Sequence, residues 1–379
     1  MSAPLTAEQY AAFARDGFLV LPNFYERAEV EAVQRGVHSI IGLLIEQHQL
    51  AIKQTDFAPE TFDAGYQALI AQDRALGGVV YDAAKQIPAF IRLVASAQHE
   101  AVVRQVRGTD APAIAAGGYG IRIDNPAEEK FRAGWHQDYP AQFRSLDGLV
   151  FWSPLIAMTD ELGPVEFCIG SHKDGLVPVR EMDAENSGKT GAYGLTLADE
   201  AERVAKYEKA APLTEPGDLV LVDFLTLHRS GENRAARSRW SMQMRWFNFA
   251  EPTGKRLGWV GSFAAGNDLR AVHQAHRPPG VVVGPQLLVG KVLRAEEDFR
   301  ESEVRLVTLD DERSRRVGRA TERDLGVGAA DLHPLDPEMV HECRHPGHVA
   351  LAGGDDEAVR RVPRPVVDCV RRWPRMVML

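Results

Sequence analysis

The feature that most constrains the fold is a series of short apolar runs that follows Gly117 and Gly118. Each run is rich in Val, Ile, Leu, Phe or Trp and is bounded by Gly, Pro, Asn or Asp, which is typical of β-strands joined by tight turns. The expected strands cover residues 119–124, 148–157, 165–169, 218–224 and 240–249. Because these strands follow one another at short spacing, we expect them to form a jelly-roll core.

The region before Gly117 has a different character, because its apolar residues recur at helical spacing. Thr6 and Gln9 form a capping-box pattern before a first helix, and residues 18–21 are expected to form a short buried strand. Longer helical patterns follow at residues 26–50, 66–72, 75–85, 91–95 and 100–106. Helices gathered before strands predict an α+β protein, in which a helical part at residues 1–115 supports a jelly-roll part at residues 116–250.

Two segments fall outside this pattern. Residues 173–212 are polar, lie between expected strands and contain an expected helix at 197–209, so we interpret them as an insertion or lid. From about Arg277 the apolar periodicity fades. We therefore expect one domain at residues 1–280, followed by a peripheral and poorly ordered C-terminal extension at residues 281–379.

Composition excludes several classes of protein. The 379 residues are 45% hydrophobic and carry a net charge of −9, so the chain lacks the basic footprint of a nucleic-acid-binding protein. The three cysteines are far apart and form no CxxC pair, which favours a reducing compartment. No secretory signal pattern and no apolar run of roughly 20 residues is present. We expect a cytoplasmic protein with a small-molecule substrate and without nucleic-acid or membrane partners; the sequence leaves its oligomeric state open.

The sequence also contains a candidate iron site. His136 and Asp138 are two positions apart, and on an extended strand such residues point to the same face. This pair alone is a weak signal, because any strand can carry it by chance. His228, at the end of the apolar run 218–224, offers a third ligand. Two histidines and one carboxylate with open coordination positions form the facial triad of non-haem Fe(II) oxygenases.

Arg239 supplies the residue type that a 2-oxoglutarate co-substrate requires. This keto acid chelates iron at one end and needs a cation for its far carboxylate, which the planar fork of an arginine can bind. Ser241 lies two positions along the same expected strand and can donate to the same carboxylate. The alternative is a solvated basic cluster of Arg234, Arg237, Arg239 and Arg245. That alternative suits Arg234 and Arg237, which flank a polar loop, better than Arg239.

Taken together, these motifs resemble the phytanoyl-CoA dioxygenase (PhyH) family of Fe(II)/2-oxoglutarate-dependent oxygenases. The resemblance covers roughly residues 8–250. Its carriers are residues 13–21, 135–138 (WHQD), 151–154, 162–166, 170–172, 216–218, 228–233 and Arg239. It implies a double-stranded β-helix (jelly-roll, cupin-like) core with N-terminal helical support. It also implies iron ligation by His136, Asp138 and His228, a 2-oxoglutarate contact at Arg239, and O2 as the oxidant. Because Asp138 is acidic, hydroxylation is favoured over halogenation.

The substrate is only weakly indicated. Candidate contacts are Arg122, Gln137, Tyr139 and Trp152, and an inward-pointing Arg122 or Arg144 implies an anionic or polar small molecule. We expect hydroxylation, or another oxidation, of an unactivated C–H bond in a small polar metabolite or natural-product intermediate, with release of succinate and CO2. Two alternatives stay open: a cupin-like metalloenzyme that does not use 2-oxoglutarate, and a non-catalytic jelly-roll binding or sensor protein. We expect His172 to be structural and the histidines of residues 341–348 not to form a zinc site.

Overall fold

The structure is a computed structural model and describes residues 4–181 and 194–261. The expected extension at residues 281–379, the histidine run at 341–348 and part of the expected lid lie outside the described residues. Among the helices that the structure describes, none combines the length and apolar character needed to cross a membrane.

The N-terminal region is helical, as its periodicity predicts. Its helices are α1 (Ala7–Asp16), α2 (Arg27–Gln47), α3 (Tyr66–Gln72), α4 (Arg74–Ala84), α5 (Pro88–Val94) and α6 (Ala97–Arg107), with a short 3-10 helix η1 (Pro59–Thr61). Thr6 and Gln9 form the expected capping box at the start of α1. Along α2, Val30, Val33 and Val37 are buried on one face, which explains the helical spacing of the apolar residues.

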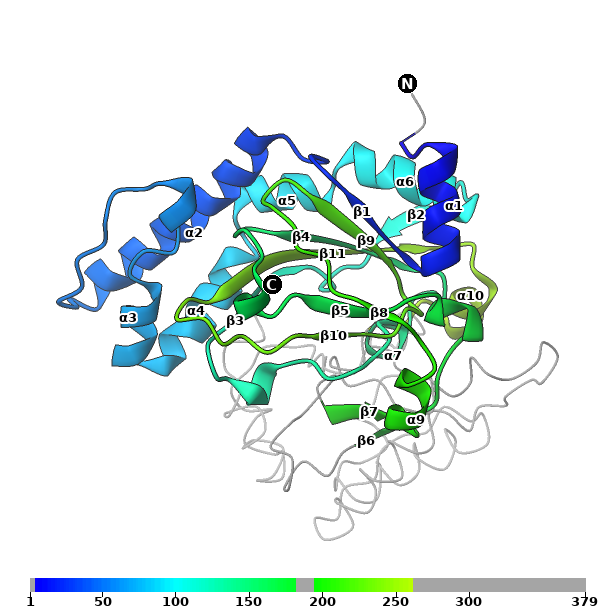
Figure 1. Ribbon diagram of the computed structural model, residues 1–379. Helices are drawn as coiled ribbons and strands as arrows, with labels where there is room; N and C mark the ends of the chain where they lie inside the picture. Colours follow the sequence, from blue (N-terminus) through cyan, green and yellow to red (C-terminus); the bar gives the residue numbers. More distant parts are fainter. Residues whose placement is uncertain (1–3, 182–193, 262–379) are drawn as a thin grey trace, which may run out of the picture. The chain divides into compact units, whose positions relative to one another are not determined.

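A six-stranded antiparallel sheet carries the rest of the domain. Its strands are β1 (Phe18–Leu21), β2 (Pro112–Ile114), β3 (Gly120–Asp124), β4 (Leu149–Pro154), β9 (Leu219–Asp223) and β11 (Arg239–Asn248). They follow the order β1-β9-β4-β11-β2, and β3 also pairs with β11. Figure 1 shows the N-terminal helices, in blue and cyan, gathered along this sheet. The buried residues of the helices and of one face of the sheet belong to one apolar core.

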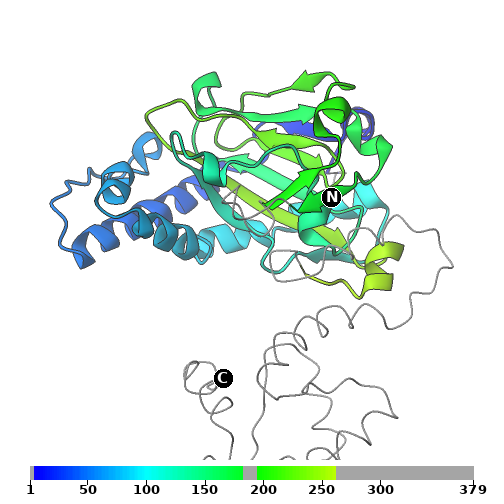
Figure 2. The same cartoon turned by 90° about the horizontal axis from the view of Figure 1, so that it is seen from below.

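A second, smaller sheet faces the first one. It consists of β10 (His228–Ser230), β5 (Val165–Cys168) and β8 (Lys209–Ala210), and a further pair is formed by β6 (Val179–Glu181) and β7 (Leu195–Leu197). Phe167 of the small sheet packs with Val150, Trp152 and Val220 of the large sheet in a second apolar cluster. The two sheets therefore form the expected double-stranded β-helix, seen from below in Figure 2.

Strand β11 separates the two clusters by strict alternation. Trp240, Met242, Met244 and Trp246 belong to the core shared with the helices. The intervening residues Arg239, Ser241, Gln243 and Arg245 therefore face the interior of the β-helix. The strand register is consistent with this orientation, because Gln243 pairs with Trp152, a member of the cluster between the sheets. A buried strand thus presents a polar face to the interior of the fold.

The expectation of a helix at residues 197–209 was wrong. Leu197 ends β7, only Glu200–Val204 forms a helix (α9), and Lys209 begins β8. Asp199 adopts a left-handed backbone conformation (φ 56°) at the N-cap, so the helix cannot extend toward β7. The remaining short elements are η2 (Glu129–Phe131), α7 (Tyr139–Gln142), η3 (Asp160–Leu162), η4 (Ser171–Asp174) and α10 (Pro252–Leu257).

Candidate metal site

The structure brings His136, Asp138 and His228 together, although not on a regular strand. His136 and His228 exchange two main-chain hydrogen bonds, each 3.0 Å long, which form an isolated antiparallel bridge. Asp138 already has helical dihedral angles (φ −71°, ψ −30°) and stands before α7. The expectation of an extended strand through Asp138 was therefore wrong, and its main-chain N–H instead donates to the Phe224 carbonyl at 2.9 Å.

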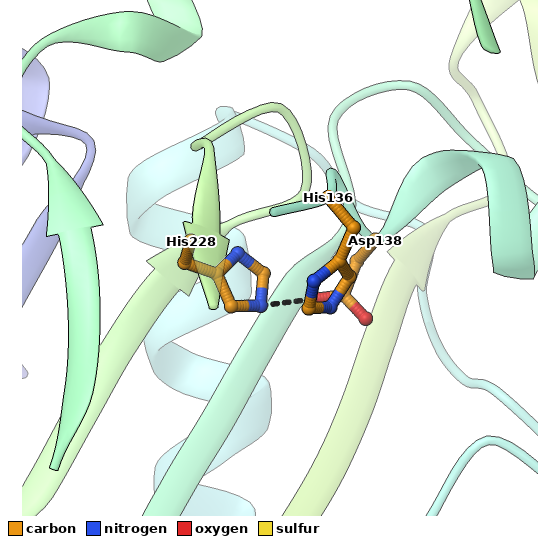
Figure 3. Close-up of side chains that lie close together, drawn as sticks. All are labelled: His136, Asp138 and His228. Atoms are coloured by element: carbon orange, nitrogen blue, oxygen red, sulfur yellow. Dashed lines mark ion pairs between the residues drawn. The ribbon is translucent and has the colours of Figure 1, made fainter. Parts of the chain in front are cut away.

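The three side chains point toward one another (Figure 3). One potential ligand atom from each residue lies within 4.8 Å of the others. The shortest approach that the structure gives is 3.4 Å, between Nε2 of His228 and Oδ2 of Asp138. The centroids of the two imidazole rings are 4.2 Å apart. Distances of this size leave room for one ion between the three donor atoms.

Hydrogen bonds fix the tautomer of both histidines. Nδ1 of His136 lies 2.8 Å from the Gly134 carbonyl, and Nδ1 of His228 lies 2.9 Å from the Thr226 carbonyl. A carbonyl oxygen only accepts, so each Nδ1 carries the proton and each Nε2 keeps a free lone pair. Burial is the main cause that lowers the pKa of His136, to about 3, and it also lowers the pKa of His228. Both rings are therefore neutral and able to bind a metal at pH 7.

The carboxylate of Asp138 has one occupied and one free oxygen. Oδ1 accepts a 2.8 Å hydrogen bond from Nε of Arg245. Oδ2 is buried and has no hydrogen-bond partner among the described residues. Burial raises the pKa of Asp138, but Arg245 and the two histidines outweigh it and lower the pKa to about 2. A buried, ionised oxygen without a partner beside two free imidazole nitrogens is well suited to a divalent cation.

Two of these residues, His136 and Asp138, line a cavity of about 240 Å³, whereas His228 is not among the residues given for its lining. Its lining includes the side chains of Arg122, Gln243 and Arg245, together with Gln142 and Thr196. Asp138 is the single carboxylate among the lining residues, whereas two arginines line the cavity. Both arginines are ion-paired, Arg122 with Asp124 and Arg245 with Asp138, so the lining is polar and charged.

Arg239 and Ser241 lie inside the β-helix but do not line this cavity. Arg239 is almost fully buried, and its guanidinium donates to Asp124 at 2.8 Å and to the Gly163 carbonyl. Asp124 also accepts from Arg122 at 2.8 Å, so one carboxylate serves two guanidiniums. Burial raises the pKa of Asp124, but Arg122 and Arg239 outweigh it and lower the pKa to about 2. Oγ of Ser241 is buried without a hydrogen-bond partner among the described residues.

The four candidate substrate contacts fall in different places. Arg122 lines the cavity. The residue Gln137 also borders it, but its side-chain amide donates to two main-chain carbonyls and accepts from the Val177 N–H. Tyr139 and Trp152 are buried and are not among the lining residues. The structure therefore places Arg122 and Gln137 at the cavity and Tyr139 and Trp152 away from it, and the choice of substrate contacts stays a prediction.

Sequence reasoning missed Gln243 and treated Arg245 as part of an alternative surface cluster. Both residues lie on the interior face of β11, and the Arg245 guanidinium contacts Asp138. The available signal was the alternation Arg-x-Ser-x-Gln-x-Arg between large apolar residues at positions 239–245. Four polar residues on one face of a strand with a fully apolar opposite face indicate a polar interior rather than a solvated surface.

Histidine 172 is placed as expected. It lies in η4, and its Nε2 is 3.2 Å from the Ala14 carbonyl at the end of α1. It does not belong to the group of potential ligands found among the described residues. A structural role, in which His172 connects this turn to the N-terminal helix, is therefore favoured.

Comparison with known proteins identifies the family of this chain. Residues 13–241 match the family model described as "Phytanoyl-CoA dioxygenase (PhyH)". An ectoine dioxygenase from Sphingopyxis alaskensis is 26% identical over 242 residues, which cover 61% of this chain and 72% of that protein. The matched span contains His136, Asp138, His228, Arg239 and Ser241.

Solved structures with a similar arrangement were also found. EctD from S. alaskensis with 2-oxoglutarate and 5-hydroxyectoine is 21% identical, with a TM-score of 0.44 over 66% of this chain and 78% of that chain. The carbocyclase SnoK from nogalamycin biosynthesis is 16% identical, with a TM-score of 0.43 over 68% of this chain and 92% of that chain. Since the family model matches more than half of the sequence, the chain belongs to the phytanoyl-CoA dioxygenase family of Fe(II)/2-oxoglutarate-dependent oxygenases.

Proposed function

We propose that this protein hydroxylates an unactivated C–H bond of a small anionic or polar molecule, with His136, Asp138 and His228 as the ligands of its Fe(II). One observation carries the proposal. In all three side chains the remaining polar atoms are already hydrogen-bonded, and the atoms left free are Nε2 of each histidine and Oδ2 of Asp138. Such an arrangement offers one donor atom from each residue to a single ion.

The bound iron, 2-oxoglutarate and O2 supply the oxidant, and the reaction releases succinate and CO2. The chain itself has three tasks. Its ligands hold the metal and leave positions for the keto acid and O2. Arg239 and Ser241 hold the far carboxylate of 2-oxoglutarate. The apolar cluster between the sheets excludes water from this interior.

Charge supports the assignment of Arg239. Asp124 is shared by Arg122 and Arg239, so the interior has one more positive charge than this carboxylate neutralises. Oγ of Ser241 lies two residues along the same face and has no hydrogen-bond partner within residues 4–181 and 194–261. A carboxylate that enters between them satisfies both groups. Binding there requires that the guanidinium shift part of its hydrogen bonding from Asp124 and Gly163 to the ligand.

The substrate class follows from the cavity lining. Arg122 and Gln243 present a cation and an amide to the cavity beside the metal ligands. We infer a small molecule with a carboxylate or another anionic group, held by Arg122 and oriented by Gln243. A relative named for ectoine, itself a small molecule, is consistent with this size class.

The proposal is tested by measuring succinate release with Fe(II), ascorbate and 2-oxoglutarate against a panel of small carboxylic acids and their amides. We expect turnover with at least one acid, and loss of that turnover by at least a hundredfold in Asp138→Ala and His228→Ala. His48→Ala, which changes an exposed histidine at the end of α2, serves as the matched control and retains activity. Full activity in Asp138→Ala would refute the ligand assignment.

The same assay separates the two alternatives. A metalloenzyme that does not use 2-oxoglutarate releases no succinate, yet still converts substrate when iron is present. A non-catalytic binding or sensor protein binds metal but releases no succinate above the metal-free control with any substrate.

A further inference from the structure

We infer that Arg245 is a positioning residue that makes Asp138 bind the metal through one oxygen only. This inference rests on the proposed metal site. Nε of Arg245 donates to Oδ1 of Asp138 at 2.8 Å, whereas Oδ2 has no hydrogen-bond partner in the described part of the chain and lies 3.4 Å from Nε2 of His228. The arginine therefore occupies one carboxylate oxygen and leaves the other one facing the imidazoles.

The number of Asp138 oxygens that bind the metal determines how many coordination positions stay open for 2-oxoglutarate and O2. A carboxylate can ligate a metal through one or both oxygens. With two histidines and one carboxylate oxygen, three positions of an octahedral ion stay open. The keto acid needs two of them and O2 needs the third. If Oδ1 also bound the ion, one coordination position would be lost, and the metal could not bind the keto acid and O2 at the same time.

Arg245 itself is held firmly in place. Its Nη1 donates to the Gly118 carbonyl at 3.2 Å and its Nη2 donates to Oε1 of Gln243 at 3.1 Å. Its side chain is 16% exposed, against 2% for Asp138. Position 118 has little room for a side chain, because a Cβ there would lie 2.8 Å from Cβ of Ala115 and 3.0 Å from the Ala115 carbonyl oxygen. The backbone that orients Arg245 is thus itself closely packed.

The arginine is better suited to this task than a lysine. Its planar group directs Nε at Asp138 while both Nη atoms are fixed by other acceptors, so its donors have set directions. A lysine at the same place carries the charge but not this geometry. We therefore expect Arg245→Lys to keep part of the function and Arg245→Met to lose it.

The first experiment uses Mn(II) alone as the probe. The water-proton relaxivity of the Mn(II)-loaded full-length protein reports the number of metal-bound waters. In Arg245→Met, Oδ1 is free to bind the ion and displaces one of about three waters, so we expect the relaxivity per bound ion to fall by about a third. Arg245→Lys is expected to give an intermediate value. Equal relaxivity in wild type and Arg245→Met would overturn the inference.

Arg107→Met is the matched control. It also removes the cation from a buried arginine–aspartate pair, because Arg107 donates to Asp223 at 2.7 Å with side chains 13% and 8% exposed. Neither residue is among the potential metal ligands or the cavity lining. The control is expected to lose thermal stability as Arg245→Met does, but to keep the relaxivity of the wild type. A fall of the same size in Arg107→Met would assign the effect to general destabilisation and would overturn the inference.

The second experiment measures 2-oxoglutarate binding to the anaerobic Fe(II) protein by its charge-transfer absorption. We expect Arg245→Met to weaken this binding at least tenfold, and Arg107→Met to leave it unchanged. Failure of the proposed function and failure of the role inferred for Arg245 give different results in these two experiments. If the wild type binds Mn(II) but shows no charge-transfer band with 2-oxoglutarate, the proposed function fails, whereas the relaxivity comparison still decides the role of Arg245.

Discussion

At the scale of single residues, the site depends on which atoms are left without a partner. Residue types, their order and the family resemblance were sufficient to choose His136, Asp138 and His228 as candidate ligands, and the structure brings the three side chains together. Asp138 is helical rather than extended, yet its carboxylate still reaches the two imidazoles. The contact between Arg245 and Asp138 was not predictable in the same way, because it depends on a rotamer and on a strand register a hundred residues away along the chain.

The role proposed for Arg239 in binding 2-oxoglutarate can be tested by substitution. Arg239→Ala removes the cation proposed for the far carboxylate of 2-oxoglutarate, and hydrogen bonds to charged groups contribute about 1.5–3 kcal/mol. We therefore expect the KM for 2-oxoglutarate to rise about tenfold to a hundredfold while Fe(II) affinity stays unchanged. Steady-state kinetics and metal titration measure the two effects. Arg234→Ala is the control, because Arg234 has a side chain that is 60% exposed. An unchanged KM in Arg239→Ala would remove this residue from the co-substrate site.

At the scale of elements, periodicity predicted helices and strands well and the connections between them poorly. Strands β4, β5, β9 and β11 lie where alternating or continuous apolar runs predict them. The helix expected at residues 197–209 failed because local composition does not reveal the left-handed turn at Asp199. A contact between two loops that are far apart in the sequence is equally difficult to predict from local composition. Gly231 donates its main-chain N–H to the Pro164 carbonyl at 3.1 Å, which joins the loop before β5 to the loop after β10.

The close contact between these two loops can be tested by substitution of Gly231. A Cβ on Gly231 would lie 2.6 Å from the Pro164 carbonyl oxygen and 2.7 Å from the Gly163 carbonyl carbon, both of which are main-chain atoms. Gly231→Ala must therefore separate the loops, and we expect it to lower the free energy of unfolding by about 1–3 kcal/mol. Denaturant unfolding measures this change. In the control Gly78→Ala, the new Cβ of helix α4 meets no atom within 4 Å, so stability is expected to stay equal or to rise by about 1 kcal/mol. Equal stability of both variants would contradict the close packing of the loops.

At the scale of the whole domain, the helical layer and the β-helix were predicted from the order of patterns along the chain, and the family match confirms the class of fold and enzyme. The residues that join the two layers were not predictable, because they are isolated side chains in ordinary helical sequence. His99 of α6 is the main example. Its ring stacks on Phe151 of β4 with centroids 4.1 Å apart, and its Nε2 lies 2.7 Å from the hydroxyl of Tyr25.

The burial of His99 between the helical layer and the sheet makes the stability of the domain depend on pH. Burial lowers the pKa of His99 from 6.5 to about 3. Between these values the unfolded chain binds a proton at His99 and the folded chain does not, so falling pH favours unfolding. The stabilisation is complete above pH 6.5 and decreases by about 1.4 kcal/mol per pH unit below it. His136 and His228 act in the same direction, since burial lowers their pKa values too.

The variant His99→Phe keeps an aromatic ring against Phe151 but cannot take up a proton. We expect its free energy of unfolding, measured by denaturant titration at a series of pH values, to fall less steeply below pH 6.5 than that of the wild type, by up to about 1.4 kcal/mol per pH unit. The exposed residue His48 provides the control variant His48→Gln, which should follow the wild-type curve. If the free energy of unfolding of His99→Phe and of the wild type depended on pH in the same way, the buried position of His99 would have to accommodate a charged imidazole. The contacts with Phe151 and Tyr25 would then have to open well before the domain unfolds.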